Sequence, residues 1–191
     1  MTIQSEVKSL LDDDLAHRGA SSCCGQGADE AFRAFEARWN VVVPAAVREW
    51  LKMCNGALAG EGRLLGIATD PQVDIARTYE VYDQWPAMGW LPVADDGCGN
   101  YYVAATKAEG APVYFIETIA DENSPEYAVG SDIWHFLRSM LQRCIVERDL
   151  PFDQMESNEP AAKWPFDRHK VLTDDPALQN VAGAPKPWAL G

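Results

Sequence analysis

Apolar and polar residues alternate through the middle of the chain, from residue 89 to residue 117, with the two-residue period typical of β-strands. The alternation predicts strands at 90–94, 99–105 and 112–117. Residues 95–100, Asp-Asp-Gly-Cys-Gly-Asn, separate the first two strands, and these residue types tolerate the left-handed backbone of hairpin turns. The pattern therefore predicts an antiparallel sheet at the centre of the chain. Two shorter strands are expected at 63–68 and 126–129.

Four other segments repeat their apolar residues at steps of three and four, which predicts amphipathic helices. Asp29 can cap the second of them, and Pro44 suits the first position of the third. Asn55 and Gly56, which both tolerate left-handed geometry, can end that third helix. The last helix, capped by Ser131 or Asp132, must cover something apolar, and one face of the sheet is the obvious partner. The four segments are 3–17, 29–39, 44–54 and 131–150, and residues 71–84 form either a helix or an irregular crossing.

The expected fold class is α+β, an antiparallel β-sheet packed by α-helices. The chain of 191 residues is long enough for one domain with an appendage. We place the domain at 1–150 and a C-terminal extension at 151–191, where six of the 12 prolines fall and periodicity is lost. The aromatic residues Trp164, Phe166 and Trp188 suggest that this extended tail, which can form a helical turn near Asp175–Gln179, is ordered and packed on the domain.

The sequence contains five cysteines, an odd number at spacings that suggest no disulfide pattern. Cys54 and Cys144 fall on the apolar faces of predicted helices, as inert core residues do. Cys98 lies in the predicted turn. A flexible segment is the favoured interpretation of Cys23-Cys24, ahead of a reactive or metal-binding pair.

The formal net charge is −13, and residues 58–130 carry most of it, with 12 acidic and 3 basic residues. A field of this sign repels nucleic acid and anionic membranes, and it attracts a basic partner. Acidic composition for solubility alone is the competing explanation. The chain has no apolar run near the ~20 residues needed to span a bilayer. The first residues also lack the basic and apolar regions of a secretory signal, so we expect a cytoplasmic protein.

Candidate catalytic residues are few. Asp95 and Asp96 together suit Mg²⁺ or Ca²⁺, but a hairpin turn needs the same residue types, and the calcium-loop pattern is not met. His135 falls at the margin of an apolar helix face, where a structural role is favoured over that of a general base. Catalytic and phosphate-binding motifs are missing. We therefore expect no enzyme activity, no cofactor and no metal.

Aromatic residues lie in or beside the acidic stretch 70–96, and charge around aromatic anchors is typical of protein interfaces. For Trp85 the sequence favours core and interface about equally. We predict that a partner binds at Asp70, Asp74, Glu80, Asp83, Trp85, Asp95 and Asp96.

A series of short motifs resembles the SUKH superfamily in order and spacing. The motifs are Phe32-x-x-Phe35-Glu36, Val43–Leu51, Cys54-Asn55-Gly56, Leu64–Ile67, Leu91–Tyr102, Pro112–Phe115, Trp164–Asp167 and Asp174–Leu178. The resemblance implies an α+β fold and a cytoplasmic immunity protein that binds and blocks a cognate polymorphic toxin, often a nuclease. Fungal relatives are signalling and cell-wall regulators, so a regulatory scaffold is the alternative. A metal-dependent hydrolase that uses Asp95 and Asp96 is the third candidate.

Overall fold

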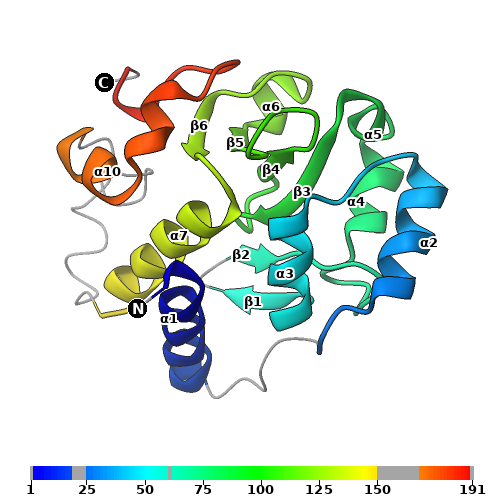
Figure 1. The fold of residues 1–191 in the computed structure, drawn as a ribbon, viewed down its shortest axis with the longest axis horizontal. Helices are drawn as coiled ribbons and strands as arrows, with labels where there is room; N and C mark the ends of the chain where they lie inside the picture. The colour runs from blue at the N-terminus through cyan, green and yellow to red at the C-terminus, as the bar shows by residue number, and fades with distance from the viewer. Residues whose placement is uncertain (1, 19–24, 60–61, 150–167, 190–191) are drawn as a thin grey trace.

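The strands that the structure describes form one antiparallel sheet, in which they lie side by side in chain order (Figure 1). The structure is a computed structural model and describes residues 2–18, 25–59, 62–149 and 168–189. The expected α+β fold is confirmed, with hairpin connections at the centre of the chain. The strands are β1 (Ala57–Ala59), β2 (Gly62–Leu64), β3 (Trp90–Asp95), β4 (Tyr101–Ala105), β5 (Val113–Ile116) and β6 (Tyr127–Gly130).

The four predicted helices are present, and their bounds agree closely with the expected ones. Residues 71–84 contain one short helix that follows a turn, and five short elements were not predicted: β1, α5, α6, α10 and η2. Among the described residues, no helix has both the length and the apolarity needed to cross a membrane. The helices are α1 (Ile3–Arg18), α2 (Asp29–Trp39), α3 (Ala45–Met53), α4 (Ile75–Val81), α5 (Trp85–Met88), α6 (Thr118–Asp121), α7 (Ile133–Asp149) and α10 (Arg168–Asp174), with 3-10 helices η1 (Pro176–Asn180) and η2 (Pro187–Ala189).

Helices cover both faces of the sheet. Neighbouring residues of a strand point to opposite faces. Tyr102 of β4 lies 5.0 Å, ring centre to ring centre, from Phe136 of α7. Its neighbour Tyr101 lies 5.5 Å from Trp85 of α5, so α5 covers the opposite face. The last helix therefore covers one face, as expected. Because the other face is covered too, β5 and β6 are buried along their whole length and not on alternate residues.

The end of α3 differs from the prediction in an informative way. Gly56 has a positive φ of 100°, as expected, but Asn55 does not adopt the left-handed conformation. Instead the buried Asn55 side chain bonds to both backbone groups of Ile67: its Nδ2 donates to the carbonyl at 2.8 Å, and its Oδ1 accepts from the N–H at 2.8 Å. Gly66 makes this approach possible, since a Cβ there would lie 2.5 Å from the Asn55 carbonyl oxygen. Asn55 thus ties α3 to the chain that leaves β2.

The N-terminal ends of α2 and α3 also differ by one residue from the expected caps. Ala28 and not Asp29 is the N-cap of α2, and it makes no side-chain cap bond. Asp29 lies in the first turn, where its carboxylate pairs with Lys52 Nζ at 2.7 Å. Pro44 is the N-cap of α3 and not its first residue.

The described part of the C-terminal extension packs on β5, β6 and the start of α7. Asp175 accepts hydrogen bonds from Ser131 N and Ser131 Oγ, both at 2.7 Å. Tyr114 Oη donates to the Ala182 carbonyl at 2.6 Å, and Leu178 is fully buried. Short helices form this part: the helical turn expected near Asp175–Gln179 is present as η1, whereas α10 and η2 replace the extended chain expected on either side of it. Trp188 packs against the core, whereas Trp164 and Phe166 lie outside the described residues.

The cysteines differ from the expectation at one position. Cys54 is fully buried, but it is disulfide-bonded and not an inert thiol. Cys98 is exposed and Cys144 is buried, while Cys23 and Cys24 lie outside the described residues. The sequence suggested no disulfide pattern, and disulfides are rare in cytosolic proteins, so this bond does not support the expected cytoplasmic location.

Candidate functional site

The loop before α4 places two of the predicted carboxylates at the start of that helix. Asp74 is the N-cap of α4, and its Oδ1 accepts from Ala76 N at 3.0 Å. Asp70 Oδ1 accepts from Gln72 N at 2.9 Å, which closes the turn that precedes the cap. Asp and Asn are favoured at both positions because their short side chains accept hydrogen bonds from nearby backbone N–H groups. The two acids are therefore held in place by local bonds.

A small open pocket of about 170 Å³ lies between α4, this loop and the sheet. Arg63 of β2 and Tyr101 of β4 line it from the sheet, and Asp74 lines it from the loop. Arg77 and Val81 line it from α4. The pocket thus combines segments that lie up to 38 residues apart in the sequence.

Arg63 fixes the side of the pocket formed by the sheet. Its Nε donates to Asp95 Oδ2 at 2.6 Å, and its Nη1 donates to the Gln72 carbonyl at 2.9 Å. Among the described residues, no acceptor lies within hydrogen-bond distance of its Nη2. The Arg63 side chain is 39% exposed and that of Asp95 only 1%. Burial raises the pKa of Asp95, an effect that the Arg63 guanidinium offsets only in part.

Arg77 stands on the helix side of the pocket and is well exposed. Its Nη1 lies 3.0 Å from Glu80 Oε2, one turn further along α4. Glu80 also pairs with Arg38 of α2, at 3.5 Å. Exposed ion pairs of this kind stabilise a fold by at most about 1 kcal/mol, so a ligand can replace them at little cost.

A cluster of aromatic rings packs behind Tyr101, one of the residues that line the pocket. Trp85 is fully buried and donates from Nε1 to the Glu122 carbonyl at 2.9 Å. It stacks on Tyr82 at 4.3 Å and meets Tyr101 edge-on at 5.5 Å. Burial raises the pKa of Tyr101, which keeps its hydroxyl neutral. Trp85 is therefore a core residue that holds the Tyr101 wall in place, and its side chain offers no surface to a partner.

The carboxylates of Asp95 and Asp96 both serve the turn between β3 and β4. Asp95 Oδ1 accepts from Gly97 N at 3.1 Å. Asp96 Oδ1 accepts from Cys98 N at 2.8 Å and from Asn100 N at 3.0 Å. Positive φ angles at Gly97 (75°) and Gly99 (101°) complete the turn. The turn interpretation explains both residues, and no cluster of three potential metal ligands occurs within the part of the chain that the structure describes.

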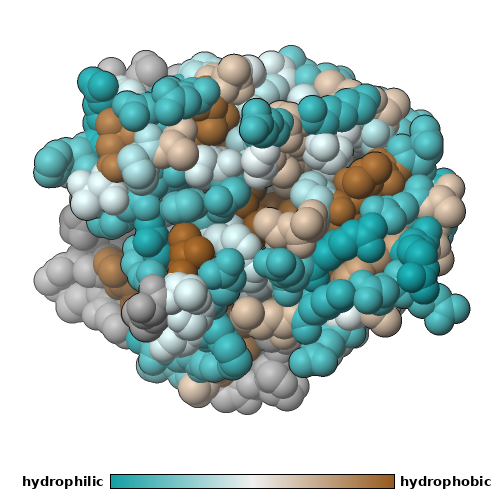
Figure 2. Space-filling view, in the orientation of Figure 1, coloured by the Kyte–Doolittle hydropathy of each residue, from teal (hydrophilic) through white to brown (hydrophobic). Residues whose placement is uncertain are grey.

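The predicted partner-binding residues therefore divide by exposure. Asp70, Glu80 and Asp83 are exposed, while Asp74 and Asp96 are half-buried. Trp85 and Asp95 are fully buried, so the prediction that they contact a partner is corrected: tertiary packing and the Arg63 ion pair remove them from the surface. Figure 2 shows a face that is largely hydrophilic, with small hydrophobic patches between the polar residues.

The sequence interpretation included Asp74 of the pocket but missed three other residues that line it: Arg63, Arg77 and Tyr101. One signal was available. The acidic stretch 58–130 holds only three basic residues, and two of them, Arg63 and Arg77, line this one pocket. The few basic residues of a strongly acidic segment are therefore candidates for a binding site.

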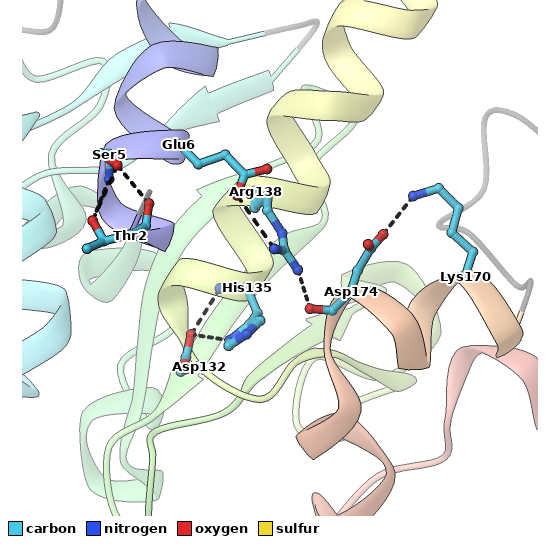
Figure 3. Close-up of polar contacts among 8 residues, drawn as sticks. All are labelled: Thr2, Ser5, Glu6, Asp132, His135, Arg138, Lys170 and Asp174. Carbon is cyan, nitrogen blue, oxygen red and sulfur yellow. Dashed lines mark hydrogen bonds and ion pairs between the residues drawn. The ribbon is translucent and has the colours of Figure 1, made fainter.

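A second polar cluster joins both ends of the described chain to the start of α7 (Figure 3). Arg138 pairs with Glu6 of α1 at 3.6 Å and donates to the Asp174 carbonyl of α10. His135 Nδ1 lies 3.0 Å from Asp132 Oδ1, and this hydrogen bond raises the pKa of His135. Burial alone would raise the pKa of Asp132, but bonds from the His135 ring and backbone outweigh it and lower that pKa. This cluster holds terminal segments on the domain.

The SMI1 / KNR4 family (SUKH-1) matches residues 27–139, more than half of the chain. The chain therefore belongs to this family, as its motifs suggested. The matched region contains the sheet, the pocket and the start of α7, whereas α1 and the C-terminal segment lie outside it. No curated protein and no solved structure matches the chain significantly.

Proposed function

We propose that the protein is an immunity protein that neutralises a cognate toxin by binding it at the face around α4. The observation that carries the proposal is the arrangement of exposed carboxylates around a preformed pocket in a chain of the SUKH-1 family. That family includes toxin immunity proteins and cell-wall regulators. The partner is a toxin with a basic surface, such as a nuclease presents to nucleic acid, and the proposed compartment is the cytoplasm.

Charge favours a basic partner at this face. Asp70, Glu80 and Asp83 are exposed within the segment that carries 12 acidic and 3 basic residues. Exposed charges of one sign raise the association rate with a partner of the opposite sign, and they repel partners of the same sign. They add little to affinity one by one, so the affinity must come from buried contacts at the centre of the interface.

The proposed mechanism is occlusion and needs no chemistry from this chain. A stable complex buries roughly 800 Å² on each partner. A surface of that size includes Val81, a hydrophobic side chain at the pocket wall that is 72% exposed, and reaches beyond the pocket to the half-buried Tyr82. The carboxylates of the turn stay occupied by backbone N–H groups, so we assign no catalytic role to Asp95 or Asp96.

Charge reversal tests the proposal. The product of the adjacent upstream gene, tested as the candidate toxin, is co-expressed with the wild-type protein or with the double variant Asp70→Lys, Asp83→Lys. Both residues are exposed, so the fold should persist. We expect the association rate to fall at least about tenfold at low salt, and less at high salt, because four units of charge change at the rim.

Glu109→Lys is the matched control. Glu109 is exposed in the same acidic segment, but it follows β4 and lies beyond the end of that strand opposite to Tyr101. The Glu109→Lys variant should associate with the toxin at the wild-type rate and should protect growing cells from it as well as the wild-type protein does. Equal protection by the wild-type protein and the double variant, with equal association rates, would reject the acidic face as the binding site.

A further inference from the structure

We infer that the pocket beside α4 receives one acidic side chain, a glutamate or aspartate, of the partner protein. The inference rests on the proposed function and adds the chemistry of one anchor to it. Its basis is the presence of two guanidinium groups, those of Arg63 and Arg77, in a single small pocket.

The charge inside the pocket is opposite to that of the surrounding segment. Arg63, Arg77 and Asp74 are the charged residues that line it, whereas residues 58–130 together have a large acidic excess. Asp74 directs one carboxylate oxygen to the backbone of α4. The pocket therefore offers cations to a ligand within a surface that otherwise repels anions.

The two arginines keep hydrogen-bond donors available. Arg63 uses Nε and Nη1 for Asp95 and Gln72, and among the described residues its Nη2 has no acceptor. Arg77 uses Nη1 for Glu80, an exposed pair that a carboxylate of the ligand can replace. Guanidinium groups match carboxylates because two parallel N–H groups can bond to the two oxygens.

The size and the walls of the pocket indicate a side chain and not a cofactor or a free metabolite. Pockets for small organic ligands usually enclose about 300–1,000 Å³, whereas this one encloses about 170 Å³ and is open to solvent. Leu65, Val81 and the Tyr101 ring supply apolar walls, which suit the methylene groups that carry the carboxylate. Such an acid would fix the orientation of a basic partner on this face, because the exposed carboxylates around the pocket repel it.

The test uses the full chain labelled with ¹⁵N and follows the arginine Nε–H resonances by NMR. The probe is N-acetyl-glutamate amide, and N-acetyl-glutamine amide is its neutral match. We expect saturable shifts at Arg63 and Arg77 with the acid and none with the amide. Arg77→Gln should weaken binding of the acid about tenfold, because it removes a charged donor.

Arg38→Gln is the matched control, since Arg38 pairs with the same Glu80 but does not line the pocket. It should leave the affinity for the probe unchanged. Equal weakening by both variants, or no saturable shift, would overturn the inference. Saturation by inorganic phosphate without saturation by the acid would also overturn it.

The outcome is independent of the test of the proposed function. Asp70 and Asp83, which that test reverses, do not line the pocket. If the probe does not bind but neutralisation still depends on Asp70 and Asp83, only the pocket anchor is rejected. If the probe binds, Arg77→Gln weakens that binding and the protein neutralises no toxin, the pocket is supported and the immunity role is rejected.

Discussion

Replacing Asn55 by alanine should destabilise the protein strongly, although the residue lies outside the binding face. The side chain is 5% exposed and satisfies both the N–H and the carbonyl of Ile67, each at 2.8 Å. Alanine leaves these two backbone groups without partners in the interior. A buried polar group that loses its partner costs about 1–3 kcal/mol, so we expect a loss of about 2–6 kcal/mol in the free energy of unfolding. That is a large share of the ~5–15 kcal/mol that typical domains possess.

Urea unfolding followed by tryptophan fluorescence measures the effect, with the slope checked for two-state behaviour. Asn180→Ala is the control, because Asn180 is exposed at the end of η1 and should change the stability by less than ~0.5 kcal/mol. Asn55→Asp should also destabilise at neutral pH, since a carboxylate oxygen would then face the Ile67 carbonyl. A loss below ~1 kcal/mol for Asn55→Ala would show that the two bonds do not hold α3 to the segment after β2.

Two further predictions concern the start of α7. The bond to Asp132 raises the pKa of His135 above its usual 6.5, so charged His135 stabilises the fold fully below about pH 6.5, and this stabilisation is lost as the pH rises through the folded-state pKa. His135→Gln should thus reduce the unfolding free energy more at about pH 5.5 than at about pH 8.5, and an equal reduction would contradict the assignment. Asp175→Ala leaves Ser131 N without its acceptor, costs about 1–3 kcal/mol and should speed tryptic cleavage within residues 168–189. An unchanged cleavage rate would show that the carboxylate does not hold this segment.

Long periodic segments could be predicted from the sequence because their pattern repeats several times. The helices α2 and α7 and the strand pair β3 and β4 each carry enough residues to show a period. The three-residue strand β1 and the four-residue helix α6 are too short to show one. The turn 95–100 was predictable because only a few residue types fit its backbone.

The binding face was harder to predict, because exposure depends on tertiary contacts. Asp95 and Asp96 are adjacent and chemically identical, yet one is fully buried and the other is not. Asp95 ends β3 between β2 and β4 and pairs with Arg63, a residue 32 positions away, whereas Asp96 lies in the turn. Trp85 is also held by distant residues, since it packs on Tyr101 and donates to the Glu122 carbonyl 37 residues away. The pocket exists only where residues of β2, α4 and β4 meet.

The most direct test of the proposed function is neutralisation of a purified partner. The tagged protein is isolated from its native cell, and the product of the adjacent upstream gene is expressed alone and together with it. We predict a one-to-one complex with a basic toxin domain, toxicity of that domain alone, and loss of toxicity on co-expression. The Asp70→Lys, Asp83→Lys variant should protect less well, because it binds the toxin more slowly. Toxicity that persists with wild-type protein, or a partner without toxic activity, would contradict the immunity role and favour a regulatory scaffold.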